Sequence, residues 1–515
     1  MTVSVRYIGT SRPYFETGVT GKQTSWYPGE AAAVPDADAA LLLATGVFEY
    51  GETAGGKSAN DNRTIPSHAT AVVGAARFGG PMGFSLGIAT FGDSLTDNGY
   101  YSSGTDVTER ARGWSTWIGP MSMQRMRVVA NFAKKTNGLL TAGTSPAGYP
   151  LSVQVTQALA DPRWSAVNVA AIMIGTNDTT FTQAACVAEL LAQIQRIGKP
   201  VVLVASPPMG SAAGPTTVVG DGMQKWVWNL QWRAMLKRIA DASPHRVKFV
   251  DGYSVLVDTS SATNNYLSTR TYDDIHNNNA AAYLVADAFV SALMPTLGNT
   301  ANTDLDIWAT NTSAATTGTG VLGMIDQGFA NPILATASGG TGTGTVAGSL
   351  AITNIGTATH SGSVISNPNG FGNMQRIAIT SSAAADGVQL ATSSFHAAGG
   401  TFASAGDILW GEAIVTVNSG GIYPKNMFFR LNGFSNPTNY NNLLWDAETS
   451  PAEVVLPFSG TRTFLLRTPS WTVPAGVTFS NMDIKFRPIF AGAGSCTIDV
   501  GNIACRRIRA GGVYS

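Results

Sequence analysis

Four polar residues of this sequence could do chemistry together: Ser94, Asn177, Asp273 and His276. Ser94 follows the apolar run Phe84–Phe91, and Asn177 follows a second apolar run, Ala170–Ile174. The histidine stands three residues after the aspartate, just before a predicted helix. A serine, a histidine and a carboxylate are the set that acyl transfer uses as nucleophile, base and orienter of the base.

The two apolar runs must place these groups. Each run is short and bounded by turn-forming residues, which predicts a buried strand. The carboxyl ends of parallel strands meet at one edge of a sheet, where α/β proteins bind their ligands. A serine after a strand is more often only a helix N-cap, so Ser94 gains its significance from the histidine and the carboxylate later in the chain.

The expected roles follow from the chemistry of ester hydrolysis. Ser94 would attack the carbonyl carbon, and His276 would accept its proton and return it to the leaving alcohol. Asp273 would hold the imidazole, since a tight turn lets a carboxylate fold back onto a ring three residues later. Asp274 is the neighbouring alternative for that role.

Three blocks in this order resemble the SGNH (GDSL-type) hydrolase family: Gly92-Asp93-Ser94-Leu95, Gly175-Thr176-Asn177-Asp178 and Asp273-Asp274-Ile275-His276. The resemblance implies an esterase, often one that removes O-acetyl groups from sugars. It also implies a flavodoxin-like α/β/α fold, and its register favours Asp273 over Asp274. The implied oxyanion donors are the Ser94 N–H, the Asn177 side-chain amide and a glycine N–H.

The glycine donor is the open part of this assignment. Gly143 precedes a helix predicted from about Pro150 and suits the second block of the family best, with Gly138 and Gly148 as alternatives. Three acidic residues near the site are expected to brace turns rather than to react: Asp93, Asp97 and Asp178.

Residues 84–297 alternate strands with helices, which predicts a parallel sheet covered on both faces. The expected strands are Phe84–Phe91, Val128–Ala130, Val167–Ile174, Val201–Val204 and Val247–Val250. Two apolar stripes at helical spacing predict core helices. The stripes are Trp228, Trp232, Met235 and Ile239, and then Ala282, Ala286, Phe289 and Leu293.

The flanking regions differ in composition. Residues 1–52 predict a small α+β module for docking or assembly, with an edge strand at Val3–Ile8 and a helix from Pro35 that ends at Gly46. Residues 53–83 predict a linker. Residues 298–515 predict an antiparallel β-sandwich of jelly-roll type. Its expected strands include Ile414–Val417, Met427–Leu431, Val454–Leu456, Phe464–Leu466, Ile484–Phe486 and Ile498–Val500.

The sandwich region is rich in aromatic residues and poor in charge. Trp410 and Trp471 lie beside apolar runs and are expected in its core. Trp445 and Tyr440 lie among asparagines, which predicts surface rings that could pack on the flat faces of sugars.

Composition excludes several classes of function. The 515 residues carry 32 basic and 32 acidic side chains, and only 12% are charged, so nothing predicts nucleic acid or an anionic membrane as partner. No apolar run has the length of a membrane span, and the N-terminus lacks a signal-peptide pattern. The three cysteines predict buried thiols, with a meeting of Cys496 and Cys505 across a hairpin as the alternative. No metal-binding motif or cofactor is expected.

The arrangement of a small N-terminal module, an esterase and a Gly/Thr-rich sandwich resembles bacteriophage tail-spike or tail-fibre proteins. That resemblance implies an acetylated bacterial polysaccharide as substrate, a homo-oligomer (typically a trimer) and other virion tail proteins as partners. It also implies location in the virion tail, after synthesis in the bacterial cytoplasm without a signal peptide. The rival interpretations are a lipase or thioesterase of the same superfamily and a non-enzymatic receptor-binding protein.

Overall fold

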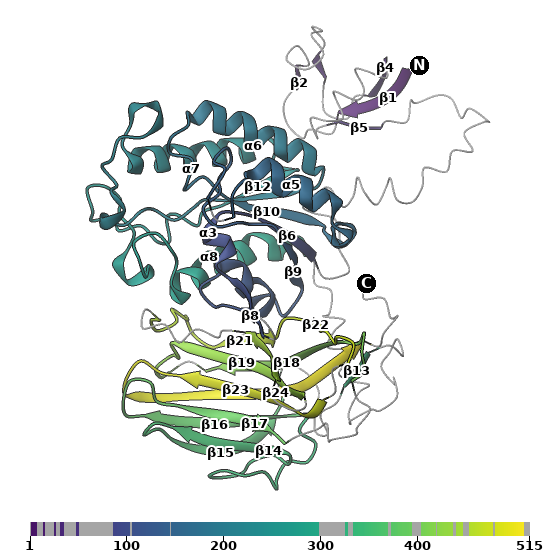
Figure 1. The fold of residues 1–515 in the computed structure, drawn as a ribbon, viewed down its shortest axis with the longest axis vertical. Helices are drawn as coiled ribbons and strands as arrows, with labels where there is room; N and C mark the ends of the chain where they lie inside the picture. Colours follow the sequence, from purple (N-terminus) through teal and green to yellow (C-terminus); the bar gives the residue numbers. More distant parts are fainter. Residues whose placement is uncertain are drawn as a thin grey trace, which may run out of the picture.

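The computed structural model in Figure 1 shows a parallel α/β domain stacked on a β-sandwich. It describes residues 86–103, 106–144, 146–297, 325–327, 333–368, 372–393, 403–418, 420–435, 439–445, 453–476 and 479–508, and five short strands before residue 51.

A five-stranded parallel sheet forms the centre of the α/β domain. Its spatial order is β12-β11-β10-β6-β9, which in chain order is 5-4-3-1-2, the flavodoxin-like arrangement. The strands are β6 (Leu86–Gly92), β9 (Met126–Asn131), β10 (Val169–Met173), β11 (Val201–Val204) and β12 (Val247–Val250). All five were predicted from the sequence: β6, β10 and β11 are covered on both faces and are continuous apolar runs, while the edge strands β9 and β12 are short runs rich in valine.

Each face of the sheet packs on its own layer of helices, since successive strand residues point to opposite sides. Ala89, Phe91 and Ile172 face α5 (Leu151–Ala160), α6 (Gln183–Ile197) and α7 (Lys225–Ala242). The opposite face, with Ile88, Ala171 and Val202, packs on α8 (Asn279–Leu293) and on the short helices η2 (Trp114–Trp117) and α4 (Ile118–Met121). The predicted helical stripes at Trp228 and Ala282 therefore lie in the core.

The β-sandwich consists of two seven-stranded sheets. One sheet has the order β15-β16-β24-β18-β21, with β13 and β22 beside it, and the other has the order β14-β17-β23-β19-β20-β8-β7. Its longer strands are β14 (Leu350–Ile355), β15 (Thr359–Ser366), β16 (Asn373–Ser381), β17 (Gly387–Thr392), β18 (Ile408–Val417), β19 (Asn426–Ser435), β20 (Asn439–Trp445), β21 (Arg462–Arg467), β23 (Phe479–Ile489) and β24 (Gly494–Ile508). The two short ones are β13 (Ile325–Gln327) and β22 (Trp471–Thr472).

Two strands of the second sheet come from the α/β domain. β7 (Tyr100–Ser103) and β8 (Asp106–Glu109) form a hairpin directly after the first helix of that domain, and β8 pairs in parallel with β20. The hairpin leaves and re-enters the α/β domain where Gly99 and Gly113 meet, and a Cβ on Gly113 would lie 2.2 Å from the Gly99 Cα. Only glycine fits at this crossing, because the two backbones approach so closely. We call this contact of Gly99 with Gly113 the neck; through it the α/β domain contributes two strands to the sandwich sheet.

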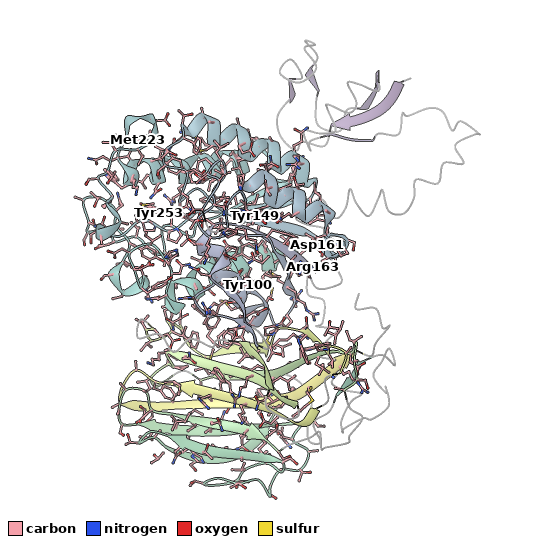
Figure 2. All side chains as sticks on the ribbon, viewed as in Figure 1. Tyr100, Tyr149, Asp161, Arg163, Met223 and Tyr253 are labelled. Atoms are coloured by element: carbon pink, nitrogen blue, oxygen red, sulfur yellow. The ribbon has the colours of Figure 1, made fainter. Side chains whose placement is uncertain are left out.

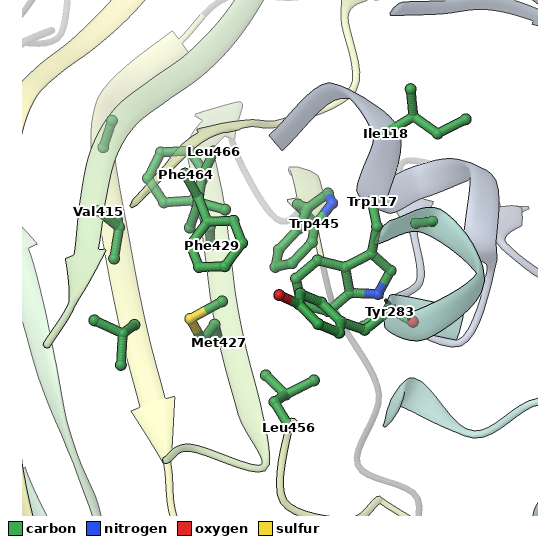
Figure 3. Close-up of a cluster of buried hydrophobic side chains, with 14 of the residues drawn as sticks. Trp117, Ile118, Tyr283, Val415, Met427, Phe429, Trp445, Leu456, Phe464 and Leu466 are labelled. Atoms are coloured by element: carbon green, nitrogen blue, oxygen red, sulfur yellow. Dashed lines mark hydrogen bonds between the residues drawn. The ribbon is translucent and has the colours of Figure 1, made fainter. Parts of the chain in front are cut away.

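The seam between the domains is a cluster of buried aromatic rings (Figure 3). Trp117 of η2 meets Trp445 of β20 edge to face, with ring centroids 4.8 Å apart, and also contacts Tyr283 of α8 and Phe464 of β21. Trp445 is 0% exposed, and its indole N–H donates to the Thr116 carbonyl. The prediction that Trp445 is a surface ring for sugars is therefore wrong, because the ring is taken up by a partner domain that its polar neighbours in sequence do not reveal.

Two other predictions fail for similar reasons. Val454–Leu456 forms no strand, since the N–H and carbonyl of Val454 bond to the side chain of Asn279 at the start of α8. In the N-terminal region, β1 (Thr2–Tyr7) is not an edge strand: it lies between β4 (Ala31–Pro35) and β5 (Phe48–Tyr50). Pro35, where the predicted helix begins, is the last residue of β4, and the rest of that predicted helix (residues 36–46) and the side chain of Tyr440 lie outside the described residues.

Other predictions for the core hold. The buried strands of the sandwich include the runs at Ile414, Phe464 and Ile498. Trp410 is buried. All three cysteines are buried and free. Within the described residues, one helix, Asn279–Leu297, has the length and hydropathy of a membrane span. It is α8 with the turn after it, and its buried residues pack on both the parallel sheet and the sandwich, as in the core helix of a folded domain.

The seam predicts that the two domains depend on each other for stability. Trp445→Ala should lower the free energy of unfolding by about 3–5 kcal/mol, the usual cost of removing a large buried ring. Urea denaturation followed by circular dichroism would measure the loss. Trp226→Ala is the matched control, since this tryptophan is partly exposed and its indole bonds only to Gln224. An equal, small effect of both substitutions would contradict a shared core.

Candidate active site

The end of β6 fixes the position of Ser94. Gly92 is the last strand residue, and its N–H and carbonyl both bond to the side chain of Gln154, which is fully buried on α5. A Cβ on Gly92 would lie 2.3 Å from the Met173 carbonyl oxygen, so the strand can end here only with glycine. Asp93 then caps the short helix α3 (Ser94–Asp97) through the Leu95 N–H, which places Ser94 at its first position.

His276 reaches Ser94 from a loop 182 residues later. The Ser94 Oγ lies 2.8 Å from His276 Nε2, and His276 Nδ1 lies 2.6 Å from the Asp273 carboxylate. The other oxygen of that carboxylate accepts the backbone N–H groups of Ile275 and His276 at 3.1 and 2.7 Å. One carboxylate thus closes the turn and holds the ring, which is the geometry expected from the Asp-x-x-His spacing.

Asp274 takes no part in this arrangement. Its backbone has a left-handed φ of 66°, and its carbonyl and carboxylate accept the N–H groups of Gly210 and Ala212. The structure therefore brings Asp273, and not Asp274, to the histidine.

The Asp273–His276 pair lies near solvent. The His276 side chain is 22% exposed and the Asp273 side chain 39%. Burial acts to raise the pKa of Asp273, but the hydrogen bonds from the His276 ring and backbone outweigh it and leave the pKa below its ordinary value. Asp273 is therefore ionised at neutral pH and can stabilise a positive charge on the imidazole.

Asn177 lies on the loop after β10 and is held from two sides. Its side-chain N–H2 donates one hydrogen to the Asn137 carbonyl at 2.8 Å, and its own carbonyl accepts the Thr141 hydroxyl at 2.9 Å. An amide has two hydrogens, so the second is left for another acceptor. The Ser94 N–H has no acceptor among the residues that the structure describes.

Gly143 does not fit the oxyanion role predicted for it. Its N–H donates to Asn137 Oδ1 at 2.7 Å in a buried position, so this donor is already satisfied. The N–H of the alternative Gly138 bonds to the Thr141 carbonyl. The correction comes from Asn137, a buried side chain that folds the loop onto itself through Gly143 and Tyr149.

Sequence patterns did not point to Asn137 or Gln154, because each side chain acts by bonding backbone groups: Gln154 bonds those of Gly92, and Asn137 accepts the N–H groups of Gly143 and Tyr149. Asp178 works in the same way and was expected to brace a turn. Its carboxylate accepts the N–H groups of three consecutive residues, 139–141, at 2.7–3.0 Å, and so ties the loop of β9 to the loop of β10. Asp97 also braces a turn, through the Lys135 N–H.

Asp93 is fully buried directly before Ser94, where its carboxylate accepts the Leu95 N–H. Burial, with a smaller contribution from the charge of Asp178, raises the pKa of Asp93 to about 7. The folded protein thus favours the neutral carboxyl group beneath the serine.

A separate cavity of about 550 Å³ lies at the domain seam, lined by residues that include Tyr100 and Arg163 (Figure 2) and Glu109, Trp410 and Arg467. Burial raises the pKa of Glu109 to about 7. Several of its polar groups are already paired: Arg467 and Trp410 bond to the buried Glu412, and Arg163 bonds to Asp161. The pairs with Glu412 lie within the sandwich and the Arg163–Asp161 pair lies within one turn of the α/β domain, and no residue of the Ser94 site lines this cavity.

Within the described residues, no cluster of three or more histidine, cysteine or acidic side chains could hold a metal ion. What the site holds is a serine hydroxyl bonded to an imidazole that is itself bonded to an ionised carboxylate. It also holds two N–H donors, on Ser94 and Asn177, at the same edge of the sheet. This is the equipment for nucleophilic acyl transfer.

Comparison with known proteins agrees with this description. The model of the GDSL-like Lipase/Acylhydrolase family matches residues 90–283. Residues 90–283 form a GDSL-like domain. The match spans β6 to the first turn of α8 and includes every residue of the Ser94 site.

Solved structures similar to this chain share low sequence identity with it. A putative acylhydrolase from Bacteroides fragilis is 15% identical, with 41% of this chain and 88% of that chain covered and a TM-score of 0.30. A putative arylesterase from Agrobacterium tumefaciens is 18% identical over 41% of this chain and 100% of its own, with a TM-score of 0.31. A family 11 carbohydrate-binding module from Clostridium thermocellum is 15% identical, with 32% of this chain and 91% of that chain covered and a TM-score of 0.18. No curated protein matches the sequence.

The buried carboxyl group beneath the serine of the GDSL-like domain predicts a pH-dependent stability. Because the pKa of Asp93 is higher in the folded than in the unfolded chain, folding retains a proton, and this contribution to stability is lost as pH rises from about 4 through 7. Asp93→Asn keeps the cap but has no proton to lose. The free energy of unfolding of Asp93→Asn, relative to that of the wild type, should therefore rise by on the order of 3 kcal/mol between pH 5 and pH 8.

Chemical denaturation at the two pH values would test this. Asp241→Asn, at an exposed side chain on α7, is the control and should show no such gain. If the difference in free energy of unfolding between Asp93→Asn and the wild type is the same at both pH values, Asp93 is ionised in the folded protein and the prediction is wrong.

Proposed function

We propose that this protein is a serine esterase that removes O-acetyl groups from a bacterial surface polysaccharide. The observation that carries the esterase part is the continuous line of contacts from Asp273 through His276 to Ser94 Oγ, at 2.6 and 2.8 Å. His276 accepts the serine proton as Oγ attacks the ester carbonyl. The resulting imidazolium is stabilised by Asp273, and then gives the proton to the leaving sugar hydroxyl.

The negative charge that develops on the carbonyl oxygen needs donors. The Ser94 N–H and the remaining amide hydrogen of Asn177 are the groups available for it, and each such donor contributes about 3 kcal/mol of transition-state stabilisation. Water then attacks the acetyl-enzyme, with His276 again as base, and releases acetate. Asp178 and Asn137 act only by holding the loop that positions Asn177.

Two features support a polymer as the alcohol part of the substrate. The Asp273–His276 pair is partly exposed, so the ester can be presented by a chain that stays outside the protein. The domain is also fused to a β-sandwich, an architecture used by many carbohydrate-binding proteins, although the buried Trp445 can no longer be one of its sugar-binding rings.

We also propose that the protein is part of a bacteriophage tail, assembled as a homo-oligomer. The support is the order of parts, with a small β-sheet module before the GDSL-like domain and a large sandwich after it. Light scattering coupled to size-exclusion chromatography would test this: a trimer is the expected species, and a monomer would contradict the proposal.

The nucleophile is tested by Ser94→Ala. Hydrolysis of p-nitrophenyl acetate should fall by about a million-fold in kcat, the scale found for triad nucleophiles, with the melting temperature unchanged. A loss smaller than about a hundredfold would exclude Ser94 as the nucleophile.

The substrate class is tested by acetate release from O-acetylated capsular polysaccharide and by comparing p-nitrophenyl acetate with p-nitrophenyl palmitate. We expect acetate release that Ser94→Ala abolishes, and a strong preference for the short ester. A preference for palmitate would indicate a lipase, and an inactive wild-type protein would indicate a receptor-binding protein.

A further inference from the structure

The two hydrogen bonds of His276 hold its edges, but a third contact holds its face. The ring of Tyr272 lies nearly parallel to the imidazole, at an interplanar angle of 17° with 5.6 Å between ring centroids. Tyr272 directly precedes Asp273, and its N–H donates to the His276 carbonyl. The residue is therefore part of the same closed turn that carries the Asp-x-x-His pair.

The Tyr272 contact contributes more to the orientation of the imidazole here than it would in a fully buried triad. The Asp273 carboxylate is 39% exposed, so water competes for it and screens its attraction to the imidazole. Packing of one ring on another is not weakened by such competition. A ring bonded only at two nitrogens can still tilt out of plane, and a flat neighbour on its face restricts that tilt.

Tyr272 is itself placed by a residue from the interdomain hairpin. The Arg112 guanidinium carbon lies 5.3 Å from the centroid of the Tyr272 ring, within the range of a cation–π contact. Arg112 belongs to the turn that follows β8. That turn is closed by bonds from the Gly113 N–H and the Thr116 hydroxyl to the Arg110 carbonyl, and Arg110 donates to Gly99 at the neck.

A physical connection thus runs from the sandwich to the histidine. β20 pairs with β8, and the turn after β8 carries Arg112. Arg112 contacts the ring of Tyr272, and that ring packs on the face of the His276 imidazole. The same hairpin begins three residues after the end of α3, the helix that carries Ser94. Both partners of the Ser94–His276 bond are therefore set relative to the hairpin that the sandwich sheet holds.

We propose that Tyr272 is the positioning residue that orients the His276 imidazole, and that Arg112 fixes Tyr272 from the sandwich-bound hairpin. The inference rests on the proposed esterase function and adds a residue outside the three blocks that carry the family resemblance. Tyr272 contacts the base and not the ester, so its loss affects the rate of the chemical step rather than substrate binding.

The test compares Tyr272→Ala with Tyr272→Phe in the full chain on p-nitrophenyl acetate. Tyr272→Ala should lower kcat by about 10–100-fold, the cost of a misplacement on the order of 1 Å, with KM unchanged. Tyr272→Phe keeps the ring and should restore wild-type kcat. Tyr423→Ala is the matched control, since that ring packs on Phe458 in the sandwich and its loss should leave kcat unchanged.

Inactivation by phenylmethylsulfonyl fluoride, followed by mass spectrometry, provides a readout without turnover. It reports how well His276 activates Ser94, and its rate should fall in Tyr272→Ala by the same factor as kcat. Arg112→Ala should show a smaller loss, and combining it with Tyr272→Ala should add nothing further, because the arginine acts through the tyrosine.

The proposal is overturned if Tyr272→Ala retains wild-type kcat, if it changes only KM, or if Tyr272→Phe fails to restore the rate. If Tyr272→Ala fails to fold, Tyr272→Leu replaces it, since leucine keeps the bulk but lacks the flat face, and the same loss is expected. Failure of the proposed function looks different: the wild-type protein itself would then hydrolyse no ester.

Discussion

The structure depends on one buried layer, formed by η2, α4 and α8, that is covered by a sheet on each side. Ile88 and Val202 of the parallel sheet pack on one side of it, and Phe464 and Trp445 of the sandwich pack on the other. Because the apolar side chains of this layer point both ways, neither domain completes its core alone. Removing the sandwich would expose Trp117 and Tyr283 and leave β8 without its partner β20.

The same joint reaches the active site. The chain passes from Ser94 into the hairpin that joins the sandwich within six residues, and returns through the contact of Gly99 with Gly113. The layer also carries Trp114, whose indole donates to Thr96 on the helix of the nucleophile. In this protein the edge of the parallel sheet, where the chemistry is placed, is thus braced by the neighbouring domain as well as by its own helices.

Inside the α/β domain, the backbone hydrogen bonds between strands stop at the edge of the sheet. In the loops beyond that edge, buried polar side chains bond the backbone groups instead. The Gln154 side chain bonds both backbone groups of Gly92, and the Asp178 carboxylate accepts three consecutive N–H groups. The Asn137 side chain accepts the Gly143 N–H, while the Asn137 backbone carbonyl accepts the Asn177 side-chain amide. These bonds satisfy polar groups that would otherwise be buried without partners. Each such unsatisfied group would cost about 1–3 kcal/mol of stability. The loops around the serine are consequently rigid before any substrate arrives, which is the condition for electrostatic stabilisation of a transition state.

The sequence by itself determined the local part of this description. Short apolar or valine-rich runs specified the five parallel strands, and the spacing of Asp273 and His276 specified a turn whose carboxylate meets the ring. These are contacts between near neighbours or patterns of one residue type, so they can be read without knowing the fold. The serine, histidine and carboxylate could be assigned because their residue types state their chemistry.

Only the tertiary structure decided which donors are free and which rings are exposed. Gly143 looked available until Asn137 was seen to occupy its N–H, and Trp445 looked exposed among asparagines until Trp117 was seen to cover it. Val454–Leu456 has the apolar composition of a strand, yet Asn279 takes the backbone bonds of Val454. In each case the deciding partner lies far away in the chain or acts through a backbone group, and hydrogen-bond satisfaction and burial depend on what is near in space, which the order of residues does not state.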